Sequence, residues 1–206
     1  MPRLFLITPP VSDVAAFTPI LDAALGACEI ACVLLRTDAR DDGDRKKIIR
    51  ALAPLAQQRG VALLVSDGPQ LAIRSDADGC HVESTGEPLK EALDALRPGR
   101  IVGVGGLTTR DAAMIAGEAG VDYLMFGGPQ SDDPHDAVVE RVAWWAEIFN
   151  LPCVGYAHQL AGVGDLVEAG ADFIALGDAV FEDPRGAPAA LADVVSLLAL
   201  KRESAL

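Results

Sequence analysis

Groups capable of chemistry stand just after three apolar runs of this sequence. Arg36 follows "ACVLL", Ser66 and Asp67 follow "ALLV", and His81 and Glu83 lie in "ADGCHVES". A guanidinium holds phosphate through paired hydrogen bonds, carboxylates bind hard cations, and an imidazole transfers protons near neutral pH. We therefore take Arg36, Asp67 and His81 as candidate catalytic residues, and Asp67 as a candidate metal ligand.

Glycine pairs follow two later apolar runs. They are Gly105-Gly106 and Gly127-Gly128. Backbone N–H groups in such turns can bind an anion, which makes Gly105, Gly127 and Gly128 candidate phosphate-binding residues. The alternative is that these glycines only permit tight turns.

The charged candidates also have structural interpretations. Asp67 could cap a helix that begins near Pro69, since Asp before a helix accepts its unpaired N–H groups. Arg36 could form an ion pair with Asp38 or Asp67. His81 sits among apolar neighbours and could be a core histidine with satisfied ring nitrogens.

We expect strands to position these residues. Most of the apolar runs are short and continuous rather than alternating, which is typical of parallel strands covered on both faces. We predict strands at Arg3–Thr8, Ile30–Arg36, Val61–Ser66, Gly79–Val82, Arg100–Val104, Asp122–Phe126, Pro152–Tyr156 and Asp172–Leu176. We predict helices near Val14–Leu25, Arg45–Gln58, Pro69–Arg74, Leu89–Leu96, Thr109–Ala119, Asp136–Phe149, Gly164–Ala169 and Ala189–Lys201. Pro54 lies inside the second helix and should kink it.

The phrase "EAG-(V/A)-D-(Y/F)" occurs twice, at Glu118–Tyr123 and Glu168–Phe173. Gly after a last helical residue is typical of a C-cap, so each copy marks a junction from helix to strand. Eight such units without a low-complexity linker predict one domain over residues 1–206, a single (β/α)8 TIM barrel. An open doubly wound sheet is the alternative. In a barrel, the candidate residues gather at the rim where the strands end.

Composition excludes several classes of function. A net charge of −13 and 5% aromatic residues argue against nucleic-acid binding, which needs clustered Lys and Arg or stacking rings. No apolar run approaches the roughly 20 residues that span a bilayer. The four cysteines suggest buried free thiols, and the chain opens on a strand-like run rather than a basic, apolar leader, so we expect a cytoplasmic protein. One indole of Trp144-Trp145 should face outward, where it could contact another copy in a homo-oligomer.

Seven segments occur in a distinctive order: "LFLIT", "VLLR", "LLVSD", "ADGCHV", "IVGVGGLTT", "GVDYLMFG" and "GADFIALGDAVFEDP". Together they resemble the thiamine phosphate synthase and TenI-like family over nearly the whole chain. The resemblance implies a compact (β/α)8 barrel with a phosphorylated small-molecule substrate. The synthases of this family join a hydroxymethylpyrimidine diphosphate to a thiazole phosphate and release pyrophosphate with Mg²⁺.

The resemblance also assigns roles to residues of the first strands. Arg36 matches an Arg that holds the diphosphate, whereas Asp38 stands where the family has a Lys. Asp67 matches the Asp that binds Mg²⁺. The second metal ligand of the family has no direct match, and only Glu83 or Glu87 could supply it.

The later loops depart further from the family. Gly105 replaces a Ser, and the acidic "GGPQSDDPHD" replaces a basic, hydroxyl-rich loop. Ala157-His158 matches a Gly-Gly phosphate turn, and Asp178, after Gly177, matches a Ser that caps the phosphate. The resemblance thus adds Ala157, His158, Gly177 and Asp178 to the phosphate-binding candidates. Asp178 could instead be the N-cap of a short helix.

Three functions follow as hypotheses. The first is pyrimidine–thiazole coupling with Mg²⁺, with Asp67 binding the metal and Arg36 the diphosphate. The second is a catalytically silent barrel that binds a phosphorylated small molecule. The third is a TenI-type thiazole tautomerase in which His81 or His158 transfers a proton.

Overall fold

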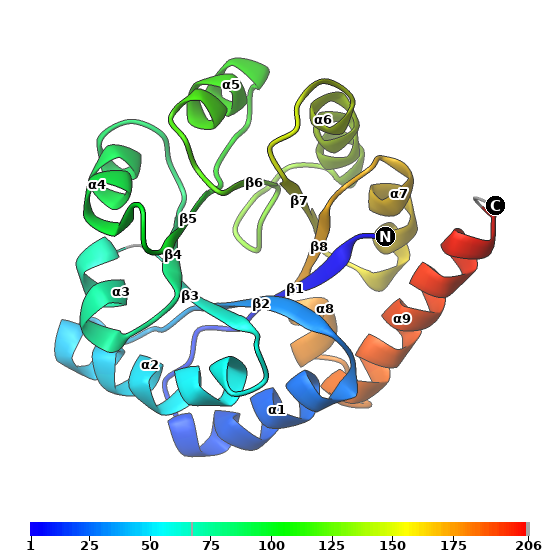
Figure 1. Ribbon diagram of the computed structural model, residues 1–206. Coiled ribbons are helices and arrows are strands. Elements are labelled where there is room, and N and C mark those ends of the chain that lie inside the picture. Colours follow the sequence, from blue (N-terminus) through cyan, green and yellow to red (C-terminus); the bar gives the residue numbers. More distant parts are fainter. Residues whose placement is uncertain (67, 205–206) are drawn as a thin grey trace.

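Eight parallel strands form a closed barrel in the order of the chain (Figure 1), in a computed structural model that describes residues 1–66 and 68–204. The TIM-barrel prediction is confirmed. The strands are β1 (Arg3–Ile7), β2 (Ile30–Leu35), β3 (Ala62–Ser66), β4 (Gly79–Val82), β5 (Ile101–Val104), β6 (Tyr123–Phe126), β7 (Cys153–Ala157) and β8 (Phe173–Leu176).

Helices cover the outside of the barrel between successive strands (Figure 1). They are α1 (Val14–Ala27), α2 (Asp42–Gln57), α3 (Pro69–Ser75), α4 (Glu87–Leu96), α5 (Arg110–Glu118), α6 (His135–Ile148), α7 (Val163–Glu168) after the short 3-10 turn η1 (Leu160–Gly162), α8 (Asp178–Phe181) and α9 (Ala187–Ser204). Most boundaries lie within two residues of the predicted ones.

Two helix starts differ from the predictions for reasons of capping. Helix α2 begins at Asp42 instead of Arg45, because the side chain of Asp41 accepts the N–H of Gly43 and starts the helix earlier. Helix α8 begins at Asp178 with Gly177 at its N-cap, so the prediction that Asp178 caps this helix is wrong by one position. Pro54 lies within α2 as predicted, and the helix continues to Gln57.

Apolar side chains form an inner core within the barrel and an outer core between strands and helices. The inner core contains large residues such as Phe5, Leu64 and Tyr123, all almost fully buried. In the outer core Trp145 is buried and donates its indole N–H to the carbonyl of Leu151 at 2.8 Å. Its neighbour Trp144 is only half-buried, as expected for an indole on the outer side of α6.

Aspartates at the start of alternate strands fasten the barrel. Asp78, Asp122 and Asp172 precede β4, β6 and β8, and each accepts the backbone N–H of a residue on the preceding strand with its carboxylate, at 2.7–2.9 Å. Each also donates its own N–H to the carbonyl of that same residue. This pair of hydrogen bonds explains why the Asp recurs in the repeated phrase. The Gly residues of that phrase, Gly120 and Gly170, have the positive φ of a helix C-terminal turn.

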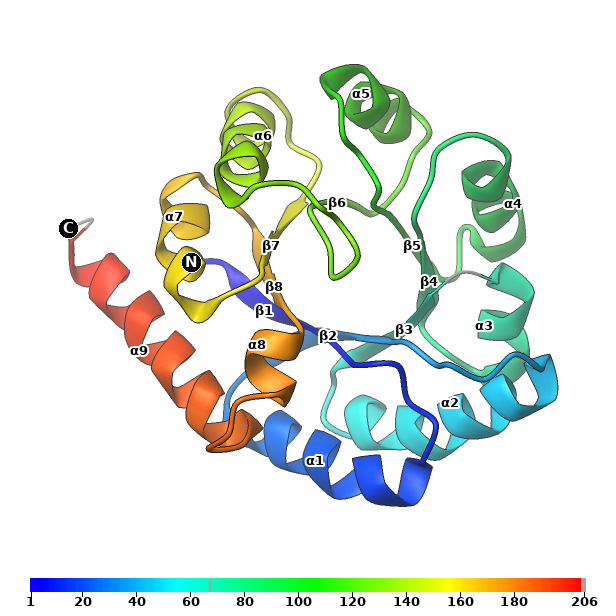
Figure 2. The same ribbon diagram turned by 180° about the vertical axis from the view of Figure 1, so that it is seen from behind.

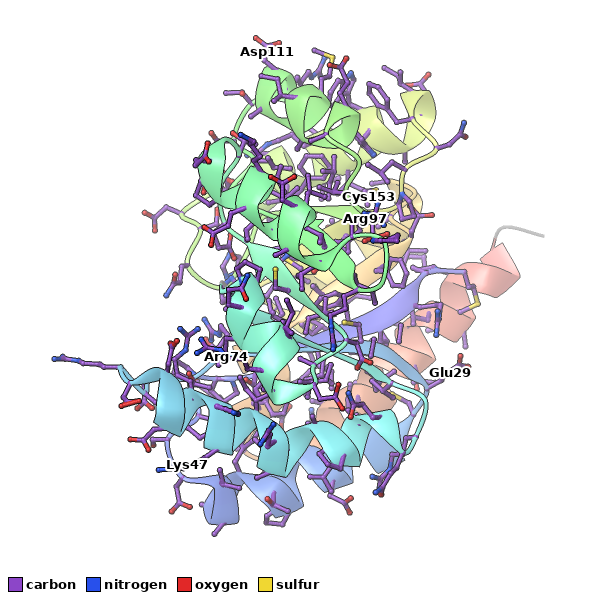
Figure 3. The ribbon with its side chains drawn as sticks, turned by 60° about the vertical axis from the view of Figure 1, so that its left-hand side comes forward. Glu29, Lys47, Arg74, Arg97, Asp111 and Cys153 are labelled. Carbon is purple, nitrogen blue, oxygen red and sulfur yellow. The ribbon has the colours of Figure 1, made fainter. Side chains whose placement is uncertain are left out.

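Charged side chains cover the outer helix faces, as Figure 3 shows for Lys47 on α2 and Asp111 on α5. Arg74 lies between α3 and α2, where it pairs with Asp42 at 2.8 Å (Figure 3). Within the described residues, no helix is long and apolar enough to cross a membrane.

The rim at the carboxyl ends of the strands is partly covered. Figure 2 shows this face: the loop between β6 and α6 reaches over the barrel mouth, and α8 lies at its edge. The loop between β6 and α6 and helix α8 thus both border the rim at which the strands end.

Candidate functional site

Arg36 is held at the rim by the neighbouring strand. Its backbone N–H donates to Oγ1 of the buried Thr8 at 3.0 Å, and its Nε donates to the carbonyl of Thr8 at 2.7 Å. Among the described residues no carboxylate forms an ion pair with Arg36, so the predicted pair with Asp38 is absent. Within residues 1–66 and 68–204 no hydrogen bond or ion pair holds the terminal nitrogens of this guanidinium, and the other predicted partner, Asp67, lies outside these residues.

A second guanidinium reaches the same place from α2. Arg45 donates from Nη2 to the carbonyl of Ser66 at 3.0 Å. It lines a cavity of about 240 Å³ together with Arg36, Ser66, Glu83 and Gln130. Arg45 is not among the predicted site residues, because it lies in a helix and not at the end of a strand. The available signal was its position in the first turn of the helix that follows β2, a helix end that points to the rim.

His81 lies fully buried on β4 between two oxygen-bearing side chains. Its Nδ1 is 2.9 Å from the hydroxyl of Tyr123, and its Nε2 is 3.4 Å from Oε1 of Glu83. Nε2 makes no hydrogen bond to a described residue, since the approach of Glu83 is poorly directed. The prediction that the ring nitrogens of His81 have hydrogen-bond partners is confirmed for Nδ1 but not for Nε2 within the described residues.

The protonation states in this group follow from burial and charge. Burial, followed by nearby thiols and carboxylates, raises the pKa of Tyr123 well above its usual value, so its hydroxyl stays protonated and can donate to His81 Nδ1. Burial also raises the pKa of Glu83, but the contact with His81 and the charge of Arg36 outweigh it and leave that pKa below its usual value. When the hydroxyl of Tyr123 donates to Nδ1, that nitrogen is the acceptor and Nε2 is the ring nitrogen that can carry an N–H toward the carboxylate of Glu83.

Gly103 in β5 and Gly105 just after this strand make room for this group. A Cβ on Gly103 would lie 2.0 Å from Cζ of Tyr123, and one on Gly105 would lie 2.7 Å from both Nε2 of His81 and Oε2 of Glu83. The N–H of Gly105 already donates to the carbonyl of Val82 at 2.8 Å. Gly105 thus provides clearance, and an anion beside it would need donors from other residues.

A second cavity of about 510 Å³ lies beneath the loop between β6 and α6. Its lining includes the residues Glu83, Gly106, Thr108, Gly127, Gly128, Gln130, Ser131, Asp132 and Asp133. Arg141 fixes the loop: it pairs with Asp133 at 2.7 Å and donates to the carbonyl of Leu107 at 2.9 Å. The hydrogen bond from Arg141, followed by that from Ser131, keeps the pKa of Asp133 below its usual value despite partial burial.

The phosphate-binding candidates after β7 and β8 lie around Tyr156. Ala157 is buried, and the exposed His158 packs its ring edge-on against Tyr156 at 4.8 Å. The hydroxyl of Tyr156 occupies the space beside Gly177, where a Cβ would lie 2.9 Å from it. Burial and then the charge of Asp178, against the opposing charge of Arg36, raise the pKa of Tyr156 to about 12.

The structure describes only one of the two predicted metal ligands. Asp67, the first predicted ligand and a predicted catalytic residue, lies outside the described residues. In the described ranges, no three His, Cys, Asp or Glu side chains come together as a metal site, and Glu83 contributes a single carboxylate. A Mg²⁺ site formed by Asp67 and Glu83 therefore stays a prediction.

Comparison with known proteins places this geometry in a family. The model of a family described as thiamine monophosphate synthase matches residues 4–180. A thiamine-phosphate synthase of Rhodospirillum centenum is 41% identical over 198 residues, covering 93% of this chain and 95% of the relative. One from Hyphomonas neptunium is 34% identical over 199 residues, covering 92% and 90%.

A solved structure of a thiamine phosphate pyrophosphorylase from Pyrococcus furiosus superimposes with a TM-score of 0.80. That alignment covers 97% of this chain and 96% of the other at 22% identity, so it supports the fold alone. The family match and the two sequence relatives identify this chain as a member of the thiamine monophosphate synthase family.

Proposed function

We propose that the protein catalyses pyrimidine–thiazole coupling in thiamine biosynthesis. In this reaction the ring nitrogen of a thiazole forms a C–N bond to the methylene carbon of a hydroxymethylpyrimidine diphosphate. The C–O bond to the diphosphate breaks, and pyrophosphate leaves with the electron pair. Thiazole phosphate is the acceptor that the family resemblance implies.

The observation that carries the proposal is the pair of guanidinium groups in one cavity. Arg36 and Arg45 both line the space of about 240 Å³ at the ends of β2 and β3. A leaving diphosphate gains negative charge as its C–O bond breaks, and fixed cations stabilise that charge in the transition state. Arg36 suits this role because its bonds to Thr8 orient the guanidinium before a ligand arrives.

Mg²⁺ is part of the proposal as a further source of positive charge on the diphosphate, with Asp67 and Glu83 as the proposed ligands. The ionised state of Glu83 supports this assignment. The arginines bind and orient the diphosphate, and the loop over the barrel mouth excludes water from the reacting carbon. A cytoplasmic location and a homo-oligomer belong to the same proposal as untested parts.

Product formation tests the proposal directly. Purified protein receives the pyrimidine diphosphate, a thiazole acceptor and Mg²⁺, and the product is oxidised to its fluorescent form. We expect Arg36→Gln and Arg45→Gln each to lower kcat/KM by about 100-fold, the usual loss when one transition-state donor is removed. Arg40→Gln is the matched control, because Arg40 lies exposed in the same loop and lines neither cavity.

Turnover that requires both cavity arginines and Mg²⁺ would support the proposal. Absence of turnover in the folded protein would reject it, as would an Arg36→Gln variant as active as the Arg40→Gln control. Asp67→Ala, compared with wild type across a Mg²⁺ titration, tests the metal assignment separately.

A thiazole tautomerase is the second candidate, and the contact of the buried His81 with the carboxylate of Glu83 favours it. An imidazole beside an ionised carboxylate can take up and return a proton. Exchange of ring protons for deuterium, followed by NMR on the thiazole without any pyrimidine donor, distinguishes this reaction from coupling. Binding of the thiazole phosphate without either reaction would support a catalytically silent barrel that binds a phosphorylated small molecule.

A further inference from the structure

A third cavity, of about 290 Å³, lies at the opposite end of the barrel, where the strands begin. Figure 1 looks onto this end. The cavity is lined by residues in or just before β1, β2, β3, β5, β6, β7 and β8. Because Ala31, Cys32 and Ala62 on β2 and β3 have small side chains, the inner core does not fill this end of the barrel.

The walls of this third cavity are apolar and carry three aromatic rings. The rings of Phe5 and Tyr123 meet edge to face with their centroids 5.6 Å apart, and both line the cavity. Phe173 contributes a third ring, which is only half-buried. Aromatic rings gain from edge-on or offset contact with one another, so these walls suit a ligand with a flat aromatic body.

The charge of the lining comes from two side chains. Burial raises the pKa of both Cys32 and Tyr123, so their thiol and hydroxyl stay protonated and add no charge. Of the described residues that line the cavity, Arg3 and Asp122 are the charged ones. The carboxylate of Asp122 already pairs with Arg97 at 2.8 Å and accepts the N–H of Val102 at 2.8 Å. Its charge is therefore largely compensated within the protein.

Arg3 is not compensated in this way. Its guanidinium lies 6.0 Å from the ring centroid of Phe173, and no carboxylate of residues 1–66 or 68–204 pairs with it. Asp78 and Asp172 are the other carboxylates near this end, but each is bound to a backbone N–H of the preceding strand and neither lines the cavity. A guanidinium binds a carboxylate through two parallel hydrogen bonds. Arg3 can therefore hold an acidic group at the edge of the apolar walls.

We propose that this end of the barrel binds a small aromatic carboxylate, with its ring between the apolar walls and its carboxylate on the guanidinium of Arg3. The volume is close to the lower limit of about 300 Å³ for pockets that bind small molecules. The site is separate from the rim and does not depend on the proposed function. It also touches the rim group, because the ring of Tyr123 lines the cavity while its hydroxyl lies 2.9 Å from Nδ1 of His81.

Calorimetry with phenylacetate tests the proposal on the purified protein without substrates. A ligand of about ten non-hydrogen atoms reaches a dissociation constant of about 1 mM at a modest binding energy per atom, so we expect this value or a lower one. Phenylacetamide has the same shape without the charge and should bind at least about tenfold more weakly, because hydrogen bonds to charged groups are the stronger ones. Weaker binding of phenylacetate, or a smaller difference between the two compounds, would overturn the proposal.

Two variants test the two halves of the site. Arg3→Gln should weaken the binding of phenylacetate at least about tenfold. Arg59→Gln is the control, because it removes the same charge from an exposed position just after α2 that does not line the cavity. Ala62→Leu fills the hollow and should abolish binding, with thermal unfolding to show that the variant is folded. Equal binding by the two arginine variants, or unchanged binding by folded Ala62→Leu, would overturn the proposal.

NMR of the two tyrosines locates the ligand, since Arg36 and Arg45 at the rim could also attract a carboxylate. The ring of Tyr123 lines the third cavity, whereas Tyr156 lines none of the three cavities and lies close enough to Arg36 to feel its charge. With ring-labelled tyrosine, assigned through Tyr156→Phe, saturating phenylacetate should shift the signals of Tyr123 and leave those of Tyr156 in place. A shift of Tyr156 alone, or equal shifts of both, would overturn the proposal.

Discussion

Removal of one buried oxygen tests the group formed by Tyr123, His81 and Glu83. In Tyr123→Phe the ring stays in the inner core, but Nδ1 of His81 loses the hydroxyl 2.9 Å away. Because His81 is fully buried, water cannot replace that partner. An unsatisfied buried polar atom costs about 1–3 kcal/mol, so the free energy of unfolding should fall by that amount.

Tyr156→Phe is the matched control. Tyr156 belongs to the same inner core and is at least as buried as Tyr123, yet its hydroxyl makes no hydrogen bond to a described residue. The same chemical change should therefore alter the free energy of unfolding by less than about 0.5 kcal/mol. The difference between the two variants isolates the bond to His81 from the general effect of losing a phenol oxygen.

Urea unfolding followed by circular dichroism measures both variants. We expect a lower midpoint for Tyr123→Phe and an unchanged slope m, since the surface exposed on unfolding is the same. Nitrogen NMR of the His81 ring should also show a shift in the balance between its two tautomers. Equal stability of the two variants, or an unaltered ring spectrum, would refute the hydrogen bond as the element that fixes His81.

Three further predictions concern other parts of the barrel. Because the bonds from Arg141 and Ser131 lower the pKa of Asp133, its carboxylate stabilises the fold above the unfolded value of 3.8, and this contribution is lost as pH falls through the lower folded value. Asp133→Asn should therefore lose less stability between pH 6 and pH 3 than wild type in urea titrations, and parallel losses would contradict this. Gly103→Ala places a Cβ 2.0 Å from the buried ring of Tyr123 and should lower the free energy of unfolding by at least about 1–3 kcal/mol. Gly26→Ala is the control, because the space around Gly26 is open and the free energy of unfolding should not fall. Thermal unfolding compares the two variants. Burial raises the pKa of the thiols of Cys28 and Cys153, the latter to about 11. A disulfide reagent at pH 8 should therefore label the native protein slowly, and should label all four cysteines only after denaturation. Rapid labelling of the native state would contradict this.

The fold was accessible from the sequence because its signals are local. Continuous apolar runs, helix C-caps and the recurring Asp before a strand each depend on a few neighbouring residues, and together they predict the closed barrel. The errors in the helix starts are also local: Asp41 competes with later residues as a cap, and Gly177 takes the cap position before Asp178.

The site was less accessible because its contacts join distant segments. Arg45 reaches Ser66 across 21 positions, and Tyr123 reaches His81 across 42. Arg45 lies in α2 and Tyr123 at the start of β6, so neither is a neighbour of its partner in the sequence. Arg36 lies at the rim as predicted, but its partner among the described residues is Thr8, just after β1, and not the neighbouring Asp38.

Gly103 in β5 and Gly105 just after it illustrate how strand register shapes the candidate site. As sequence, Gly105 is a turn residue or an anion site, and Gly103 is an unremarkable strand residue. In the barrel, Gly103 pairs with His81 on one side and Tyr123 on the other, so its missing side chain is the space through which these two residues meet. Gly105, two residues on, leaves His81 and Glu83 open to a ligand. A side chain at either position would disturb this arrangement without touching the cavity arginines. Substitutions at Gly103 and Gly105 should therefore disturb the group formed by Tyr123, His81 and Glu83, while those at Arg36 and Arg45 alter the use of the diphosphate.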